Sequence, residues 1–575
     1  MSKKIINSIC LGLFCCLSLV AQPPEEEDRK LNGGSITVVK AYDPTLSDAF
    51  KVKTMPNTTD TVAVKKRAVT YSIFSVPVAS TFRPSKGKIT KLKAKPRPDY
   101  FDNYARLGLG NYINVLAEFA ATLEIDRESD FNVFLNHNSS QGGIDEVVTD
   151  DDFSNTSLDL SYDRRTRDLN WTAGAGARYR TANWYGGFPR AALALNEDSD
   201  VGLNYFSYGI GGEISLFNGV LKTVDLQAMG LSSGEGASEF RVRLQPQLEF
   251  DIRDTAIALG VDLDYLSGSF DTQGFLPAPT DYGYFNLNLN PSINLYGDRY
   301  KVELGATVNY VSDIENSEGE FNVYPDILAS YKLLDDTVIA FLNISGGRDM
   351  NSLQSITDEN IFVAPAIAIA PTNRQVDATL GIKGNLSDRF AYKLYGGYRM
   401  EENRYFFTSD TGPSNVDATT PDFLAGNTFY TQYGDLNTIL VGGSLSYDFT
   451  DEINVVLGGE YMNYDVSNGL AFNNIASHLP EFTLDLTGNY EINDQWNVGT
   501  TLYFVGEREA FREGVATRSL DAFVDLNIDV TYDINPKLSA FLRGNNLTGG
   551  NYEFFNAYPV QNLQIMGGAV YKFDF

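Results

Sequence analysis

The sequence lacks a long hydrophobic run beyond its N-terminus. Its mean hydropathy is −0.20, and only 43% of its 575 residues are hydrophobic. After the N-terminus the longest apolar run is Ile361–Ala370, which Pro365 interrupts. A membrane-spanning helix needs about 20 consecutive apolar residues, roughly twice that length. The sequence therefore argues strongly against a helical membrane protein.

The one earlier apolar stretch has the pattern of a cleaved secretory signal. Lys3 and Lys4 precede the apolar residues 5–20, and Ala21 places a small residue before the expected cleavage point. We therefore predict a signal peptide over residues 1–21 and export of the mature chain.

Cysteine is absent from the rest of the chain, because Cys10, Cys15 and Cys16 all lie inside this signal. Cleavage after Ala21 leaves no thiol, which excludes disulfides and cysteine catalysis. The alternative is a lipoprotein signal ending at Cys15 or Cys16, but a large residue or another cysteine then precedes the lipidated cysteine.

Basic residues are scarce beyond residue 100. The net charge is −29, from 45 Lys and Arg against 74 Asp and Glu. Residues 1–100 contain 17 of the basic and 8 of the acidic residues, which leaves 28 and 66 for residues 101–575. So acidic a body argues against nucleic acid as a partner.

Residues 22–100 do not have the pattern of a regular sheet. Residues 23–28 are polar and acidic, as in solvated segments, and residues 36–39 form a short β-prone run. Residues 85–98 combine prolines, which disfavour a place inside a sheet, with six basic side chains: Lys86, Lys88, Lys91, Lys93, Lys95 and Arg97. We expect an extended periplasmic segment, and we predict that part of residues 60–100 enters and narrows the lumen of the domain that follows.

From Phe101 onward apolar and polar residues alternate with a period of two, which is typical of strands that are dry on one side. In the last strand the apolar series is Leu563, Ile565, Gly567, Ala569, Tyr571, Phe573 and Phe575. The expected strands have roughly 11 to 16 residues, longer than in soluble sheets and long enough for a tilted bilayer crossing. A chain that ends on an interfacial aromatic suits an outer-membrane barrel.

The connections alternate between short and long, as in bacterial barrels with short periplasmic turns and long outer loops. Ten short turns are expected near residues 126–130, 163–168, 217–220, 253–254, 297–298, 334–335, 387–388, 450–451, 493–494 and 535–536. The largest long connections are expected at residues 346–374 and 401–435. Counting the first hairpin strand at residues 101–110 and the last strand gives 22. The predicted fold is therefore an all-β, transmembrane antiparallel β-barrel over residues 101–575, about 40 Å across.

Three segments resemble TonB-dependent-receptor-like outer-membrane proteins. They are residues 31–50, the hairpin at residues 104–118 and the end of the chain around residues 545–573. In that family a TonB box near the N-terminus pairs with TonB, and a plug domain fills the lumen. The resemblance makes Ile36, Thr37, Val38 and Val39 the TonB-box candidate. About 60 residues separate Val39 from Phe101, too few for a full plug, so we expect the plug to be reduced or absent.

No residue is predicted to be catalytic. His137 is expected near a strand end, His478 in a solvated loop, and residues 230–234 in a turn although they match a nucleophile-elbow pattern. The Tyr- and Phe-rich residues 401–433 are expected in a loop at the barrel mouth. Asp150, Asp151 and Asp152 are weak Ca²⁺ candidates without EF-hand spacing; otherwise no metal and no cofactor are predicted.

Three functions remain open, and none is enzymatic. The first is binding or transport of a solute at the Gram-negative outer membrane by a TonB-dependent-receptor-like protein. The second is a passive, partly occluded channel. The third is a structural subunit of an outer-membrane assembly or secretion complex. The expected partners are outer-membrane lipid, TonB, and other outer-membrane or lipoprotein subunits.

Overall fold

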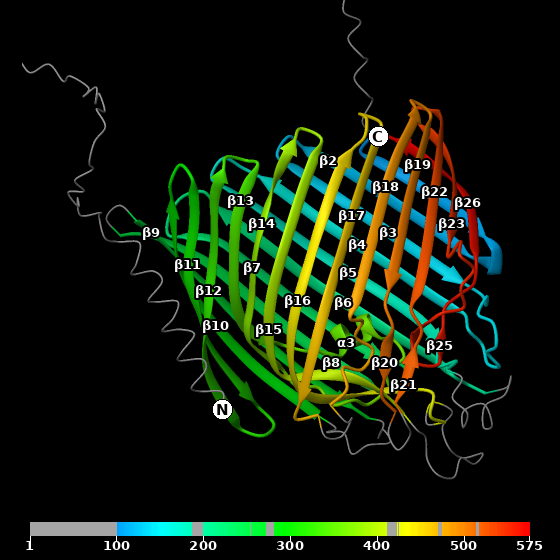
Figure 1. The fold of residues 1–575 in the computed structure, drawn as a ribbon, viewed down its shortest axis with the longest axis horizontal. Coiled ribbons are helices and arrows are strands. Elements are labelled where there is room, and N and C mark those ends of the chain that lie inside the picture. Colours follow the sequence, from blue (N-terminus) through cyan, green and yellow to red (C-terminus); the bar gives the residue numbers. More distant parts are fainter. Residues whose placement is uncertain are drawn as a thin grey trace, which may run out of the picture. The chain divides into compact units, whose positions relative to one another are not determined.

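A computed structural model describes residues 101–186, 199–252, 255–271, 281–410, 423, 425–469, 474–512 and 517–574. In these residues a single antiparallel sheet of 22 strands closes on itself (Figure 1). Closure is made by β1 and β26, which pair from Asn103 with Phe573 to Gly110 with Met566. The predicted fold and strand number are confirmed. No helix among the described residues is long and apolar enough to cross a membrane.

The first eleven barrel strands are β1 (Asn103–Gly110), β2 (Val115–Asp126), β3 (Ser129–Ser140), β4 (Phe153–Arg165), β5 (Leu169–Asn183), β6 (Gly202–Leu216), β7 (Leu221–Ser233), β8 (Ala237–Ile252), β9 (Thr255–Phe270), β10 (Asp281–Tyr296) and β11 (Tyr300–Asp313). The others are β12 (Glu318–Leu334), β13 (Val338–Asp349), β14 (Thr372–Ser387), β15 (Phe390–Ser409), β16 (Phe429–Asp448), β17 (Ile453–Ser467), β18 (Phe482–Asn493), β19 (Trp496–Val505), β22 (Phe523–Asn535), β23 (Leu538–Asn545) and β26 (Gln564–Phe573).

Six short elements lie in the connections between the described barrel strands. The 3-10 turn η2 (Asn111–Ile113) joins β1 to β2, and the helix α3 (Leu353–Glu359) lies between β13 and β14. The pairs β20 (Arg508–Ala510) with β21 (Arg518–Leu520) and β24 (Glu553–Phe555) with β25 (Tyr558–Pro559) form separate small sheets. Except for η2, these elements gather at the end of the barrel opposite the short turns and the carboxyl terminus (Figure 1).

Each of the ten predicted short turns falls between two consecutive strands. The predicted alternation of faces is also confirmed. Leu109 on the outer face is 70% exposed, whereas Asn286 and Asn309 inside the barrel are 1% and 0% exposed. A register slip of one residue would exchange these faces, so the lipid on one side and the polar lumen on the other fix the register.

Three local predictions are wrong. Strand lengths range from 8 residues in β1 and β23 to 20 in β15 and β16. The aromatic residues 405–407, predicted in a loop, lie in β15. Residues 230–233 of the predicted turn at 230–234 are the last residues of β7. The last two have a common reason: β15 and β7 continue past the expected boundary, where they stay paired and pack on buried side chains inside the barrel mouth.

Candidate functional site: the mouth and lumen of the barrel

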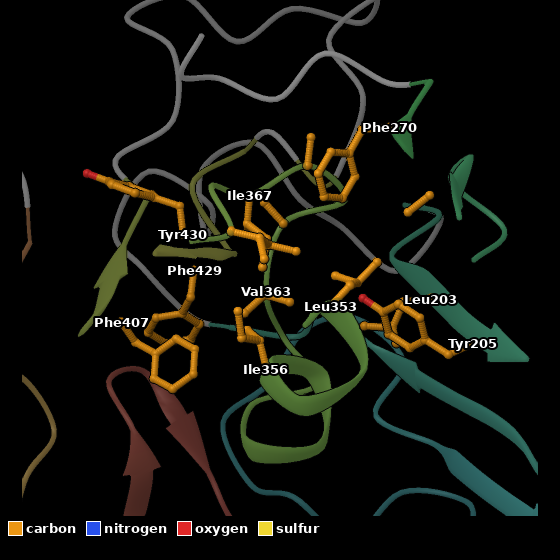
Figure 2. Close-up of a cluster of buried hydrophobic side chains, with 14 of the residues drawn as sticks. Leu203, Tyr205, Phe270, Leu353, Ile356, Val363, Ile367, Phe407, Phe429 and Tyr430 are labelled. Carbon is orange, nitrogen blue, oxygen red and sulfur yellow. The ribbon is translucent and has the colours of Figure 1, made fainter. Parts of the chain in front are cut away.

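The connection between β13 and β14 folds into the barrel rather than away from it. We call residues 350–371 the mouth segment; it contains α3 and the apolar run 361–370. Figure 2 shows Leu353 and Ile356 of α3, with Val363 and Ile367 after it, among side chains from several barrel strands. All four side chains are at most 1% exposed. A hydrophobic core therefore fills part of the mouth of an otherwise polar lumen.

The helix α3 begins with a capping box. The hydroxyl of Ser352 accepts from the backbone N–H of Ser355, whose own hydroxyl accepts from the N–H of Ser352. A wall residue completes this end, because the carboxylate of Glu239 on β8 accepts from the backbone N–H groups of Leu353 and Gln354. Tyr282 on β10 also donates to Glu239, at 2.7 Å. A buried carboxylate is thus matched to the free N–H groups of a helix start.

The other end of α3 is held by an arginine of the opposite charge. Arg180 on β5 donates to the carbonyl of Thr357 at 3.2 Å and to its hydroxyl at 3.1 Å. Arg180 also forms an ion pair with Asp358 at 2.8 Å. A cation next to carbonyl groups at a helix end is favourable, so the two wall charges together fix the position of α3 along its axis.

The apolar run after α3 has its backbone satisfied by side chains of the wall. Trp184 donates to the carbonyl of Val363 at 3.2 Å, and Tyr284 donates to that of Ile369 at 2.9 Å. The hydroxyl of Tyr433 accepts from the N–H of Ala370 at 2.8 Å. Val363 forms an isolated parallel bridge with Phe429 at the start of β16. Buried backbone groups need such partners, so the segment is built into the mouth.

His478 is buried, and the prediction of a solvated loop residue is wrong. Its Nε2 accepts from the N–H of Asn556 at 3.2 Å, so Nδ1 carries the proton and donates to Ser477 at 2.9 Å. Rings of Phe429 and Phe555 lie 5.6 Å away. Burial, and secondarily the charge of Arg508, lowers the pKa of His478 to about 3. Apart from the adjacent Ser477, its partners are distant in the sequence, which is why the sequence did not reveal them.

Below the mouth segment, the wall formed by β3–β7 is hollowed. The cavity measures about 770 Å³, and Gln354 of α3 contributes to its lining. Four inward-facing glycines lie in register here, Gly174 with Gly211 and Gly176 with Gly209. Because they carry no Cβ, the wall recedes. Polar side chains surround the hollow, among them Asn155, Asp159, Arg178, Glu213, Asp225 and Gln227.

Two smaller cavities flank the mouth segment. One, of about 400 Å³, is lined by Arg374, Arg399 and Tyr464 on the side of β13–β17. The other, of about 500 Å³, is lined by Asn155, Tyr185 and Gln561. Both have a smaller volume than the hollow. The mouth segment contributes to the lining of both, with Asn351 in the first and Ile361 and Phe362 in the second.

Arginine–carboxylate pairs recur along the inner wall. Arg241 pairs with Asp264 at 2.5 Å and Arg399 with Asp377 at 2.9 Å. Such pairs bridge neighbouring strands, β8 with β9 and β14 with β15. The lumen can therefore present both signs of charge to a polar solute.

The predicted site residues have different outcomes. The TonB-box candidate, residues 36–39, and the six basic residues of 85–98 lie outside the described residues. Asp151 accepts from the N–H of Ile144 and Asp152 accepts from Asn183, so both carboxylates take part in loop structure. Burial raises the pKa of Asp151. Within the described part of the chain, no three His, Cys, Asp or Glu side chains are grouped as a metal site.

His137 lies near the end of β3, as expected, and contacts the hydroxyl groups of Thr156 and Ser139 at 2.8 and 3.1 Å. The sequence analysis missed the mouth segment, Glu239 and Arg180. One signal was available: an apolar run of ten residues in a long connection needs a place to be buried.

Comparison with protein families matches residues 94–547 to the TonB-dependent receptor-like β-barrel. Among solved structures, the ferric-catecholate import receptor Fiu of E. coli K12 in its closed form is similar (12% identity, TM-score 0.60, 83% of this chain and 82% of that one). So are the ferripyoverdine receptor of the Pseudomonas aeruginosa outer membrane (14%, 0.60, 84% and 72%) and the siderophore receptor PirA of Acinetobacter baumannii (12%, 0.60, 84% and 81%). Comparison with curated proteins finds no match. At these identities the structural likeness is one of fold.

Proposed function

The chain belongs to the TonB-dependent receptor-like β-barrel family of the Gram-negative outer membrane, and from this premise we propose that it takes up a solute through its lumen with energy from TonB. The observation that carries the proposal is the family match over the barrel. The hollow of about 770 Å³ below the mouth segment supports it, because a site for a solute is usually concave with a few convergent polar groups.

The hollow on β3–β7 is the proposed solute site. Its lining combines carboxylates, amides and one guanidinium with exposed glycine backbone. Such a surface offers hydrogen bonds of both kinds, so the proposed solute carries polar groups. The similar solved structures include receptors whose names refer to iron–siderophore complexes, and a chelate of that polarity is one solute that the hollow would suit.

The proposed TonB contact is the segment Ile36–Val39, which is expected to pair as a strand. Proline removes a backbone donor and prevents regular pairing. We expect Val38→Pro to weaken binding of the purified full-length protein to a soluble periplasmic fragment of TonB by at least about tenfold. Isothermal titration calorimetry measures this without knowledge of the solute.

Val64→Pro, in another short apolar stretch of the N-terminal segment, is the matched control and should bind TonB as the unaltered protein does. If the unaltered protein does not bind TonB, energy-coupled uptake is wrong and the passive channel replaces it. The short interval between Val39 and Phe101 is the observation that favours this second function. Association with other outer-membrane subunits in mild detergent, without TonB, would instead favour the structural role.

A further inference from the structure

We propose that the mouth segment is a resident closure of the barrel on its long-loop side, and that Glu239 and Arg180 are the positioning residues whose release opens the lumen to large solutes. This inference does not depend on TonB coupling or on the identity of the solute. In this proposal the mouth segment, which connects β13 to β14, blocks entry to the lumen from the long-loop side.

The first argument is where the two charges stand. Glu239 and Arg180 come from β8 and β5, on one continuous side of the wall, and they bind opposite ends of the same short helix. Each meets backbone groups that a helix end leaves free. Exchanging or removing either charge leaves those groups without their partner, so α3 is held in one position and orientation.

The second argument is that apolar and polar contacts have different effects on the mouth segment. Leu353, Ile356 and Val363 are buried in the mouth, and their burial attracts the segment to the wall without fixing its direction. The charged hydrogen bonds are directional and number several per end. Because the lumen is polar, Glu239 and Arg180 would be hydrated if α3 moved away, which makes release possible without an unpaired buried charge.

The third argument is the size of what remains open. The flanking cavities of about 400 and 500 Å³ are each smaller than the hollow of about 770 Å³ below them. A solute that fills the hollow is too large for either flanking cavity, so it could reach the hollow from this side only if the mouth segment moved. In this proposal the segment is therefore a size barrier in front of the hollow.

A thiol placed in the hollow tests the barrier. Gln227 lines the hollow, and the sequence has no cysteine after position 16, so Gln227→Cys gives one reporter. A polyethylene-glycol maleimide of several kilodaltons is added to intact cells. We expect slow labelling of Gln227→Cys alone and a rate at least about tenfold higher when Glu239→Gln and Arg180→Gln are added, because charged hydrogen bonds are lost.

Arg543→Gln is the matched control. Arg543 pairs with Asp529 at 3.3 Å, on a part of the wall that does not include the contacts of Glu239 and Arg180 with α3. It should leave the rate unchanged. A third variant replaces residues 352–370 by a short Gly-Ser linker, and migration of unboiled samples in gels confirms that every variant is folded. If only the linker variant labels quickly, the role of Glu239 and Arg180 is overturned. If the linker variant labels as slowly as Gln227→Cys alone, the closure itself is overturned.

Discussion

Single buried polar side chains tie together segments of the mouth that no regular sheet connects. Ser477 and His478 are an example. The hydroxyl of Ser477 donates to the carbonyl of Phe407 at 2.8 Å and accepts from the N–H of Phe511 at 3.2 Å, while His478 accepts from Asn556. Two adjacent residues therefore bind the end of β15, the β20–β21 connection and the β24–β25 connection, and loss of either should loosen all three.

The neutral form of His478 makes this junction sensitive to acid. The pKa is lowered from 6.5 to about 3 in the folded state. Above pH 6.5 neither the docked nor the undocked state binds the proton. As the pH falls toward 3, only the undocked state does, so docking becomes weaker. At pH 5 the loss is about 2 kcal/mol, or roughly thirtyfold in the opening equilibrium.

We expect hydrogen exchange at the amides of His478 and Asn556, measured at pH 7 and pH 5, to show this additional loss of protection. His478→Gln does not titrate in this range and should show only the intrinsic change in exchange rate. Equal behaviour of the two proteins would contradict the assignment. The sequence contains only one other histidine, His137 on β3, which stays in place in both proteins.

Closure of the barrel depends on how closely three neighbouring strands approach. Gly108 of β1 and Gly568 of β26 are register partners on the inner face. The ring of Phe541 on β23 lies over both of them, because a Cβ on Gly108 would come within 2.9 Å of it. A Cβ on Gly568 would collide with Phe541 and with the carbonyl of Leu107. The two glycines provide the space for the aromatic ring that covers the seam.

Gly568→Val should therefore destabilise the closed barrel by about 1–3 kcal/mol through overpacking. The adjacent Gly567→Val is the control, because Gly567 faces outward and its nearest neighbour would be 3.9 Å from the added Cβ. We expect Gly567→Val to change stability by less than about 1 kcal/mol, since valine suits a strand facing lipid. Denaturant titration of refolded protein in detergent, read by gel mobility, checks both values. A stable Gly568→Val barrel would show that the seam adapts.

The elements were predictable to the extent that their signals are local. Alternation with a period of two and a turn residue within a few positions define a barrel strand, so strands, turns and closure were found from the sequence. The mouth segment depends on pairs such as Arg180 with Thr357 and Glu239 with Leu353, which are 177 and 114 residues apart. No local pattern encodes such pairs. The ends of β7 and β15 were missed for the same reason, because they are extended by contacts inside the mouth.

At the scale of the whole molecule, the predicted entry of the basic N-terminal segment into the lumen and the proposed outer closure make a joint prediction. The hollow is lined by Asp159, Glu213 and Asp225 against Arg178, an acidic balance that would attract residues 85–98. If the mouth segment and the N-terminal segment restrict ions in series, the narrower of the two limits conductance, and removing only the wider one changes it little.

Planar-bilayer recordings of four full-barrel proteins check this. They are the unaltered protein, a deletion of residues 85–98, the Glu239→Gln/Arg180→Gln variant, and the combination. For each variant we take the ratio of its single-channel conductance to that of the unaltered protein. We expect the ratio for the combination to exceed the product of the ratios for the two separate changes, because resistances in series add whereas independent effects multiply. If the deletion leaves conductance unchanged even with the mouth released, the basic segment does not narrow the lumen. In that case the outer closure is the barrier that the described residues provide. The acidic wall would then make the lumen selective for cations without the basic segment, and the reversal potential in a salt gradient measures that selectivity.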